Sequence, residues 1–132
     1  MYLRFVIPER DTETGVETGF FSGLLDIKYG ETGAQQWIYD EVCRELTWFN
    51  THLDAPRRLT RPGGRRGDVR GVCWFRPQAG EAISRARYCA WLLEEAGIAT
   101  RVLRRAQPGE IIWCDDMQIV AKPARDHPRL FH

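Results

Sequence analysis

The run from Gly71 to Leu103 constrains the fold more than any other part of this chain. Residues 71–75 are a short apolar segment, typical of a buried strand. Arg76-Pro77 comes next, and proline at the first position of a helix loses no hydrogen bond, so a helix is expected from there up to Gly97 as its left-handed C-cap. Residues 98–103 read as a second strand. This strand–helix–strand succession predicts a right-handed parallel crossover.

The first third of the chain adds a strand and two helices. Residues 2–7 alternate between apolar and other side chains, which predicts a strand that stops at Pro8. Residues 8–19 show no apolar periodicity and are expected to form a surface connection. Helical spacing of apolar residues predicts a short helix over 20–29 and a long one over 34–53. For the long helix, Thr32 and Gln35 match a capping box.

The C-terminal third predicts a hairpin. Residues 110–114 and 117–121 read as strands joined at Asp115-Asp116. The expected order is therefore β-α-α-β-α-β-β. We predict an α+β fold, a two-layer sandwich with a mixed sheet of four to five strands and helices on one face. One domain is expected over residues 1–122, followed by a loose tail over 123–132.

Composition is that of a folded protein whose charge is unevenly divided. The chain has 132 residues, of which 43% are hydrophobic and 28% charged, and this balance excludes a disordered chain. Residues 1–56 hold four basic and ten acidic side chains, a net charge of −6, whereas residues 57–132 hold fifteen and eight, a net charge of +7. Such asymmetry indicates either an electrostatic partner or two halves that face each other.

The four cysteines, Cys43, Cys73, Cys89 and Cys114, include no CxxC pair. We see no signal peptide and no apolar stretch of the ~18 residues that a membrane span needs. Free thiols in the cytoplasm are therefore expected, with no membrane association. Phosphate-loop, dinucleotide-binding and zinc motifs do not occur in the sequence, so no cofactor is predicted.

An arginine-rich segment is the main candidate site. It spans residues 57–70 and sets its arginines among glycines, so that guanidinium groups and backbone N–H groups can converge on an anion. We expect anion binding by Arg57, Arg58, Arg61, Arg65, Arg66 and Arg70. The partner would be a nucleic acid or an acidic protein surface. The alternative is a solvated loop, or one that pairs with the acidic first half of the chain.

Two other readings of the function stay open. Asp115 and Asp116, with Glu110, could hold a divalent metal in a small hydrolase or nuclease, although aspartates in a hairpin turn are common for conformational reasons. Surplus aromatic residues could instead form contacts in an oligomer, because neighbouring residues on one helix, such as Trp48 and Phe49, cannot both point into the core of the domain. The leading hypothesis is a small non-enzymatic binding or regulatory protein of unknown oligomeric state.

Overall fold

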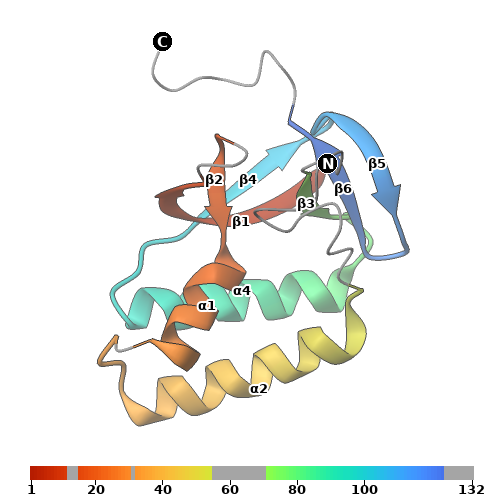
Figure 1. The fold of residues 1–132 in the computed structure, drawn as a ribbon. Coiled ribbons are helices and arrows are strands. Elements are labelled where there is room, and N and C mark those ends of the chain that lie inside the picture. Colours follow the sequence, from red (N-terminus) through yellow and green to blue (C-terminus); the bar gives the residue numbers. More distant parts are fainter. Residues whose placement is uncertain (12–14, 31, 55–70, 124–132) are drawn as a thin grey trace.

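The computed structural model describes residues 1–11, 15–30, 32–54 and 71–123. Within them the chain forms three helices on one side of a six-stranded sheet (Figure 1). The strands are β1 (Tyr2–Arg10), β2 (Glu17–Gly19), β3 (Val72–Phe75), β4 (Arg101–Arg105), β5 (Glu110–Cys114) and β6 (Gln118–Lys122), and the helices are α1 (Phe20–Tyr29), α2 (Gln36–His52) and α4 (Gly80–Glu95). The α+β class is confirmed, and the predicted order of elements matches roughly: β2 is additional, and three strands rather than two follow α4.

Strand β1 is central to the sheet because it pairs along both of its edges. Val6 lies opposite Arg101 of β4 and also opposite Gly19 of β2, so those two strands flank it. Strand β3 joins the same edge as β2, through Leu3 and Phe75. The sheet then continues from β3 to β6 and ends at β5. Two short strands therefore pair with the same edge of β1. Strand β3 pairs at Leu3 and β2 pairs at Val6, so the division between them lies between these two residues.

The parallel pairing expected in a mixed sheet is wrong, because every described pair of strands is antiparallel. Strands β3 and β4, which precede and follow α4 in the chain, do run parallel to each other. They are not neighbours, however, since β1 lies between them and pairs with both. The crossover thus skips one strand position, and the N-terminal strand fills that position.

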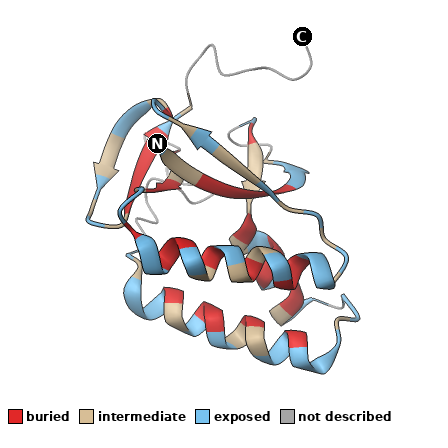
Figure 2. Ribbon diagram, turned by 180° about the vertical axis from the view of Figure 1, so that it is seen from behind, coloured by how far each residue is buried: buried red, intermediate tan, exposed pale blue. Residues whose placement is uncertain are grey.

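The main core lies between the sheet and the helices. Helices α1 and α4 lie next to the sheet, and α2 lies farthest from it (Figure 1). Figure 2 shows buried segments along β1 and on the sides of the helices that face inward. Phe5 of β1, Phe20 of α1 and Phe75 of β3 meet in this core with ring centroids 6.0–6.3 Å apart. Burial of these faces supplies most of the stabilisation of such a layered fold.

The opposite face of the sheet is also apolar. A second buried cluster there contains Val16, Val72, Trp74, Ile119 and Ala121. Strand β3 therefore has apolar neighbours on both faces, which explains how adjacent Trp74 and Phe75 can both be buried. On α2, by contrast, Phe49 is buried whereas Trp48 is only partly buried, as the helical geometry requires.

The ends of the helices differ in part from expectation. Gly97 has a φ of +89° and follows α4 in a Schellman motif, with Ile98 N donating to Leu93 O, so the predicted C-cap is confirmed. The capping box is wrong, because Gln35 itself is the N-cap of α2 and its Oε1 accepts a hydrogen bond from Trp37 Nε1. Pro77 lies in a turn before α4, since Arg76 remains bonded to Met117 O and Asp115 O.

Strand β1 also runs past Pro8, where it was expected to stop. Its register with β2 shifts between Val6 and Arg10, so the missing N–H of Pro8 falls within an irregular stretch of the ladder. Residues 17–19, read from the sequence as a surface connection, pair here as β2. The turn before β2 contains Gly15 with a φ of +74°, a conformation that glycine adopts readily.

Candidate functional site: a cavity at the start of helix α1

The residues first singled out as anion ligands, Arg57 to Arg70, lie outside the described residues. The nearest described residues before and after that segment are Asp54 and Gly71, and each adjoins Gln118 of β6 or the cavity that Gln118 lines. Asp54, just after α2, accepts a hydrogen bond through its carbonyl oxygen from Gln118 Nε2. Gly71, just before β3, lines the cavity. The two described residues nearest to the segment in the chain, Asp54 and Gly71, thus lie beside one feature.

That cavity has a volume of about 280 Å³ and lies where β2 and β3 divide the edge of β1. Its walls come from the middle of β1, the junction of β2 with α1, strand β3 and the side chain of Gln118. Six of its fourteen described lining residues have aromatic or aliphatic side chains, among them Phe5, Phe20 and Trp74. Ser22 is exposed, so this part of the wall reaches the surface.

Arg4 is the cationic side chain among the described residues that line this cavity, and it is only 9% exposed. Because side chains alternate along β1, Leu3 and Phe5 face the helices and Arg4 faces the other side of the sheet. One terminal nitrogen donates to Glu17 O at 2.6 Å. Burial lowers the pKa of Arg4 to about 10, while the carboxylates of Glu17 and Asp11 partly offset this effect. The guanidinium is thus charged at neutral pH.

Among the described residues, Arg4 forms no salt bridge. The carboxylate of Glu17 pairs instead with Arg101, at 2.6 Å. A guanidinium has five N–H donors, and the hydrogen bond to Glu17 O uses one of them. A buried cation is costly unless it is paired, so a charge with unused donors beside a cavity indicates a place for an anionic group.

The start of α1 adds positive potential to the same cavity. Gly19 is the N-cap and provides no side-chain hydrogen bond, and no acidic residue occupies the first turn. Gly19, Phe20, Phe21 and Ser22 all line the cavity. The first backbone N–H groups of a helix lack intrahelical acceptors and carry a partial positive charge. A Cβ placed on Gly19 would lie 3.8 Å from a terminal nitrogen of Arg4, so the two features are adjacent.

The thiol in the cavity wall is not a ready nucleophile. Cys73 of β3 lines the cavity, and burial raises its pKa to about 11, although the positive charge of Arg4 acts in the opposite direction. The thiol is therefore protonated at neutral pH, whereas nucleophilic cysteines are thiolates.

We expect Cys73 to resist iodoacetamide at pH 7.5 while exposed Cys114 reacts. Its alkylation rate should rise roughly tenfold per pH unit up to about pH 11, because the thiolate fraction grows in that proportion below the pKa. Peptide mass spectrometry on the Cys114→Ser variant measures this rate. Rapid alkylation of Cys73 in the folded protein at pH 7.5 would contradict the expectation.

The hairpin aspartates form a turn. Asp115 Oδ1 accepts hydrogen bonds from Met117 N at 2.8 Å and from Gln118 N at 2.9 Å. Glu110 lies at the far end of β5 and its carboxylate faces Lys122 at 3.7 Å. The structure therefore does not bring Glu110 together with Asp115 and Asp116, and among the described residues no group of three potential metal ligands occurs.

Replacing Asp115 with alanine is expected to destabilise the protein by about 1–2 kcal/mol, because two backbone N–H groups lose a charged acceptor. Asp116 is exposed, so Asp116→Ala is the matched control and should change the free energy of unfolding by less than about 0.5 kcal/mol. Urea denaturation of both variants compares them. Equal effects would show that the Asp115 side chain does not hold the turn.

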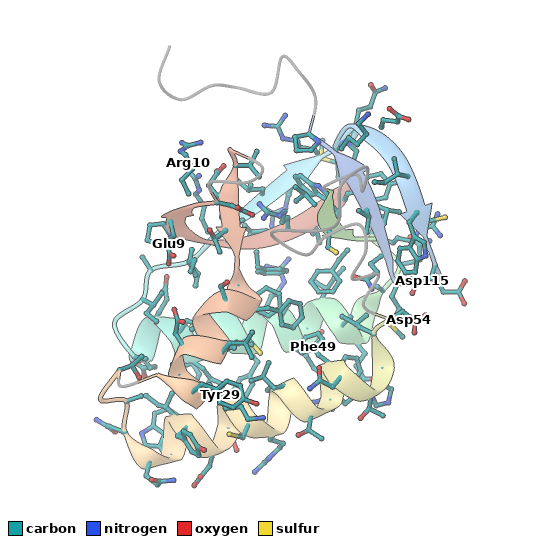
Figure 3. The ribbon with its side chains drawn as sticks, in the orientation of Figure 1. Glu9, Arg10, Tyr29, Phe49, Asp54 and Asp115 are labelled. Carbon is teal, nitrogen blue, oxygen red and sulfur yellow. The ribbon has the colours of Figure 1, made fainter. Side chains whose placement is uncertain are left out.

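The hairpin turn also ties two distant parts of the chain together. Arg76 Nη1 donates to Asp115 O, and Gln118 connects the following strand to Asp54. Figure 3 shows Asp54 and Asp115 at the same end of the molecule, away from Glu9 and Arg10. The chain just after α2, at Asp54, is thus fixed to the hairpin.

Several aromatic side chains lie on the outer side of the helices. Trp37 of α2 and Trp91 of α4 are 42% and 48% exposed, and their ring centroids are 5.8 Å apart. Tyr88 stacks on Trp91 and donates a hydrogen bond to Glu41. We call Trp37, Tyr88 and Trp91 the outer aromatic cluster. His52 is separate from it, because its ring stacks on Trp48 and its Nδ1 contacts Trp48 O at the end of α2.

Sequence reasoning missed the cavity, although one signal for it was present. Arg4 lies between Tyr2 and Val6 on one face of a strand whose other face, with Leu3 and Phe5, is also apolar, and a charge in such a strand is expected to be buried.

Comparison with protein-family models, with curated proteins and with solved structures finds no match to this chain. In the described part of the chain, no helix has the length and apolar character needed to cross a membrane.

Proposed function

We propose that this protein binds an anionic partner and is not an enzyme. The observation that carries this proposal is Arg4, a buried cation that has no salt bridge to a described carboxylate and lines a cavity at the start of α1. Such an arrangement stabilises a bound negative charge through a guanidinium and helix N–H groups together.

The arginine-rich segment extends this proposal to the surface of the partner. Its six arginines are predicted from the sequence to contact an acidic protein or a nucleic acid. The positions of Asp54 and Gly71 support this idea, because these two described residues precede and follow the segment in the chain and lie beside Gln118 or the cavity that it lines. A cytoplasmic location belongs to the same proposal and is supported by four free thiols.

The test is fluorescence anisotropy with labelled poly-L-glutamate and with a labelled DNA duplex, at low and at moderate salt. The wild type is compared with a variant that carries alanine at Arg57, Arg58, Arg61, Arg65, Arg66 and Arg70. We expect the wild type to bind at least one polyanion in a salt-dependent manner and the variant to bind it at least tenfold more weakly. Equal binding by the two proteins would remove the segment from the proposal.

A second candidate function is self-association through the outer aromatic cluster. Exposed, stacked tryptophans are typical anchors of protein interfaces. Glu41 and Arg44 flank the cluster with opposite charges and pair at 2.8 Å, so a second copy related by a two-fold axis could exchange these partners. Light scattering on the wild type and on the Trp37→Ala/Trp91→Ala variant tests it. A monomeric wild type at high concentration would end this reading.

A further inference from the structure

The lining and the size of the cavity indicate that it selects among anions and does not attract every negative charge equally. Its described walls include Phe5, Phe20, Phe21, Trp74 and Phe75 around a single arginine. A volume of about 280 Å³ is at the lower end for ligand sites, so an occupant would be a small molecule or one side chain. The apolar walls favour an occupant whose body is also apolar, because both surfaces then leave water.

The local charge balance indicates which anion fits. Arg4 contributes one positive charge and the start of α1 contributes about half a charge. Asp11 also lines the cavity, and Glu17 lies close enough to stabilise the Arg4 cation. Because Glu17 is already paired with Arg101, Asp11 is the lining carboxylate that repels a bound anion, and this repulsion is larger for a dianion than for a monoanion. A planar carboxylate, moreover, matches the fork of N–H donors on a guanidinium.

We propose that this cavity binds the carboxylate of a small apolar acid, with Arg4 and the first N–H groups of α1 as its donors and the phenylalanine and tryptophan rings around its body. The inference rests on the proposed binding function and names the anionic group that the partner presents. That group is either a free aryl or alkyl carboxylic acid or the carboxylate of a partner polypeptide, because both have the same chemistry.

Isothermal titration calorimetry with sodium benzoate tests the proposal. Benzyl alcohol is the neutral analogue and phenyl phosphate is the dianionic one, and both keep the aromatic body. We expect benzoate to bind at least tenfold more tightly than benzyl alcohol and more tightly than phenyl phosphate. Benzyl alcohol binding as well as benzoate would overturn the role of charge, and tighter binding of phenyl phosphate would overturn the choice of carboxylate.

Two variants of the cavity separate ligand binding from stability. Arg4→Met removes the charge at similar volume and is expected to weaken benzoate binding at least tenfold, while the protein stays folded, because an apolar side chain is well tolerated in place of a buried charge. Ser22→Asp places a carboxylate in the first turn of α1. It should strengthen the helix and yet weaken benzoate binding about fivefold, since it competes for the same N–H groups.

The matched control is Arg104→Met, which removes an exposed arginine of β4 and should leave benzoate affinity within twofold of the wild type. Unchanged affinity in both Arg4→Met and Ser22→Asp would overturn the site. Should Arg4→Met prove unfolded, Ser22→Asp decides alone, because added helix stability with unchanged benzoate affinity is incompatible with the proposal.

A second arm identifies the source of the carboxylate. A short peptide that ends in phenylalanine with a free carboxylate is compared with the same peptide amidated at its C-terminus. Tighter binding of the free peptide than of benzoate supports a partner polypeptide, and tighter binding of benzoate supports a free acid. The six-alanine variant should bind benzoate like the wild type. Loss of polyanion binding with retained benzoate binding, or the reverse, shows which of the two proposals fails.

Discussion

Replacing Gly71 with alanine is expected to destabilise the protein by about 2–3 kcal/mol. A Cβ at this position would lie 2.3 Å from Cγ1 of Val120 and 3.2 Å from Cδ1 of Ile112. Val120 is completely buried and its β-branched side chain has little rotational freedom, so it cannot move aside. Overpacking of this kind forces side chains from their preferred rotamers and shifts the backbone. Urea denaturation gives the free energy of unfolding.

Gly80→Ala is the matched control for that measurement. Gly80 is the first residue of α4, and a Cβ placed there meets nothing within 4 Å. Because alanine is a better helix former than glycine, this variant should be more stable than the wild type by a few tenths of a kcal/mol to about 1 kcal/mol. A destabilisation of Gly80→Ala equal to that of Gly71→Ala would contradict the steric explanation.

The Arg85→Met variant is expected to melt about 10 °C below the wild type, because it leaves a carboxylate buried without its partner. Arg85 of α4 reaches both oxygens of Glu45 on α2, at 3.2 and 3.1 Å, and the Glu45 side chain is only 6% exposed. The same guanidinium lies over the ring of Trp48, at 4.5 Å from the centroid. One residue therefore joins the two long helices through a charge pair and a ring contact.

Two comparisons test this explanation by thermal unfolding. Arg44→Met removes an arginine whose side chain is 71% exposed and whose pair with Glu41 lies on one helix, so its effect should be small. In the double variant Glu45→Met/Arg85→Met no buried charge is left without a partner, and most of the lost stability should return. A double variant as unstable as Arg85→Met would show that the carboxylate is not the cause.

The helices could be located from the sequence because their signals are local. Apolar spacing marked α1 and α2 to within two residues at each end, and Gly97 marked the end of α4. The misplaced start of α4 has a tertiary cause, whereas that of α2 has a local one. Arg76 is held by the β5–β6 turn, and Gln35 bonds the indole of Trp37 rather than completing a capping box.

Strand pairing could not be predicted in the same way. Alternation in residues 2–7 identifies a strand and its apolar face, but it does not say which strands lie beside it. The shared edge of β1 depends on two separate contacts, Val6 with Gly19 of β2 and Leu3 with Phe75 of β3, and the second joins residues 72 positions apart. The cavity lies where β2 and β3 separate along this edge, so it could not be predicted from the sequence for the same reason. Arg4 alone was visible, as a charge on an apolar strand.

The pairing of β1 with β4 has a consequence for synthesis in the cell. Tyr2 lies opposite Arg105, and Val6 lies opposite Arg101. A chain leaves the ribosome from its N-terminus, at about 5–20 residues per second. The segment that becomes the middle of the sheet therefore spends several seconds in the exit region before its last partner has been made. Nascent chains halted before residue 101 should expose this apolar segment to chaperones, and release from them should follow translation of β4.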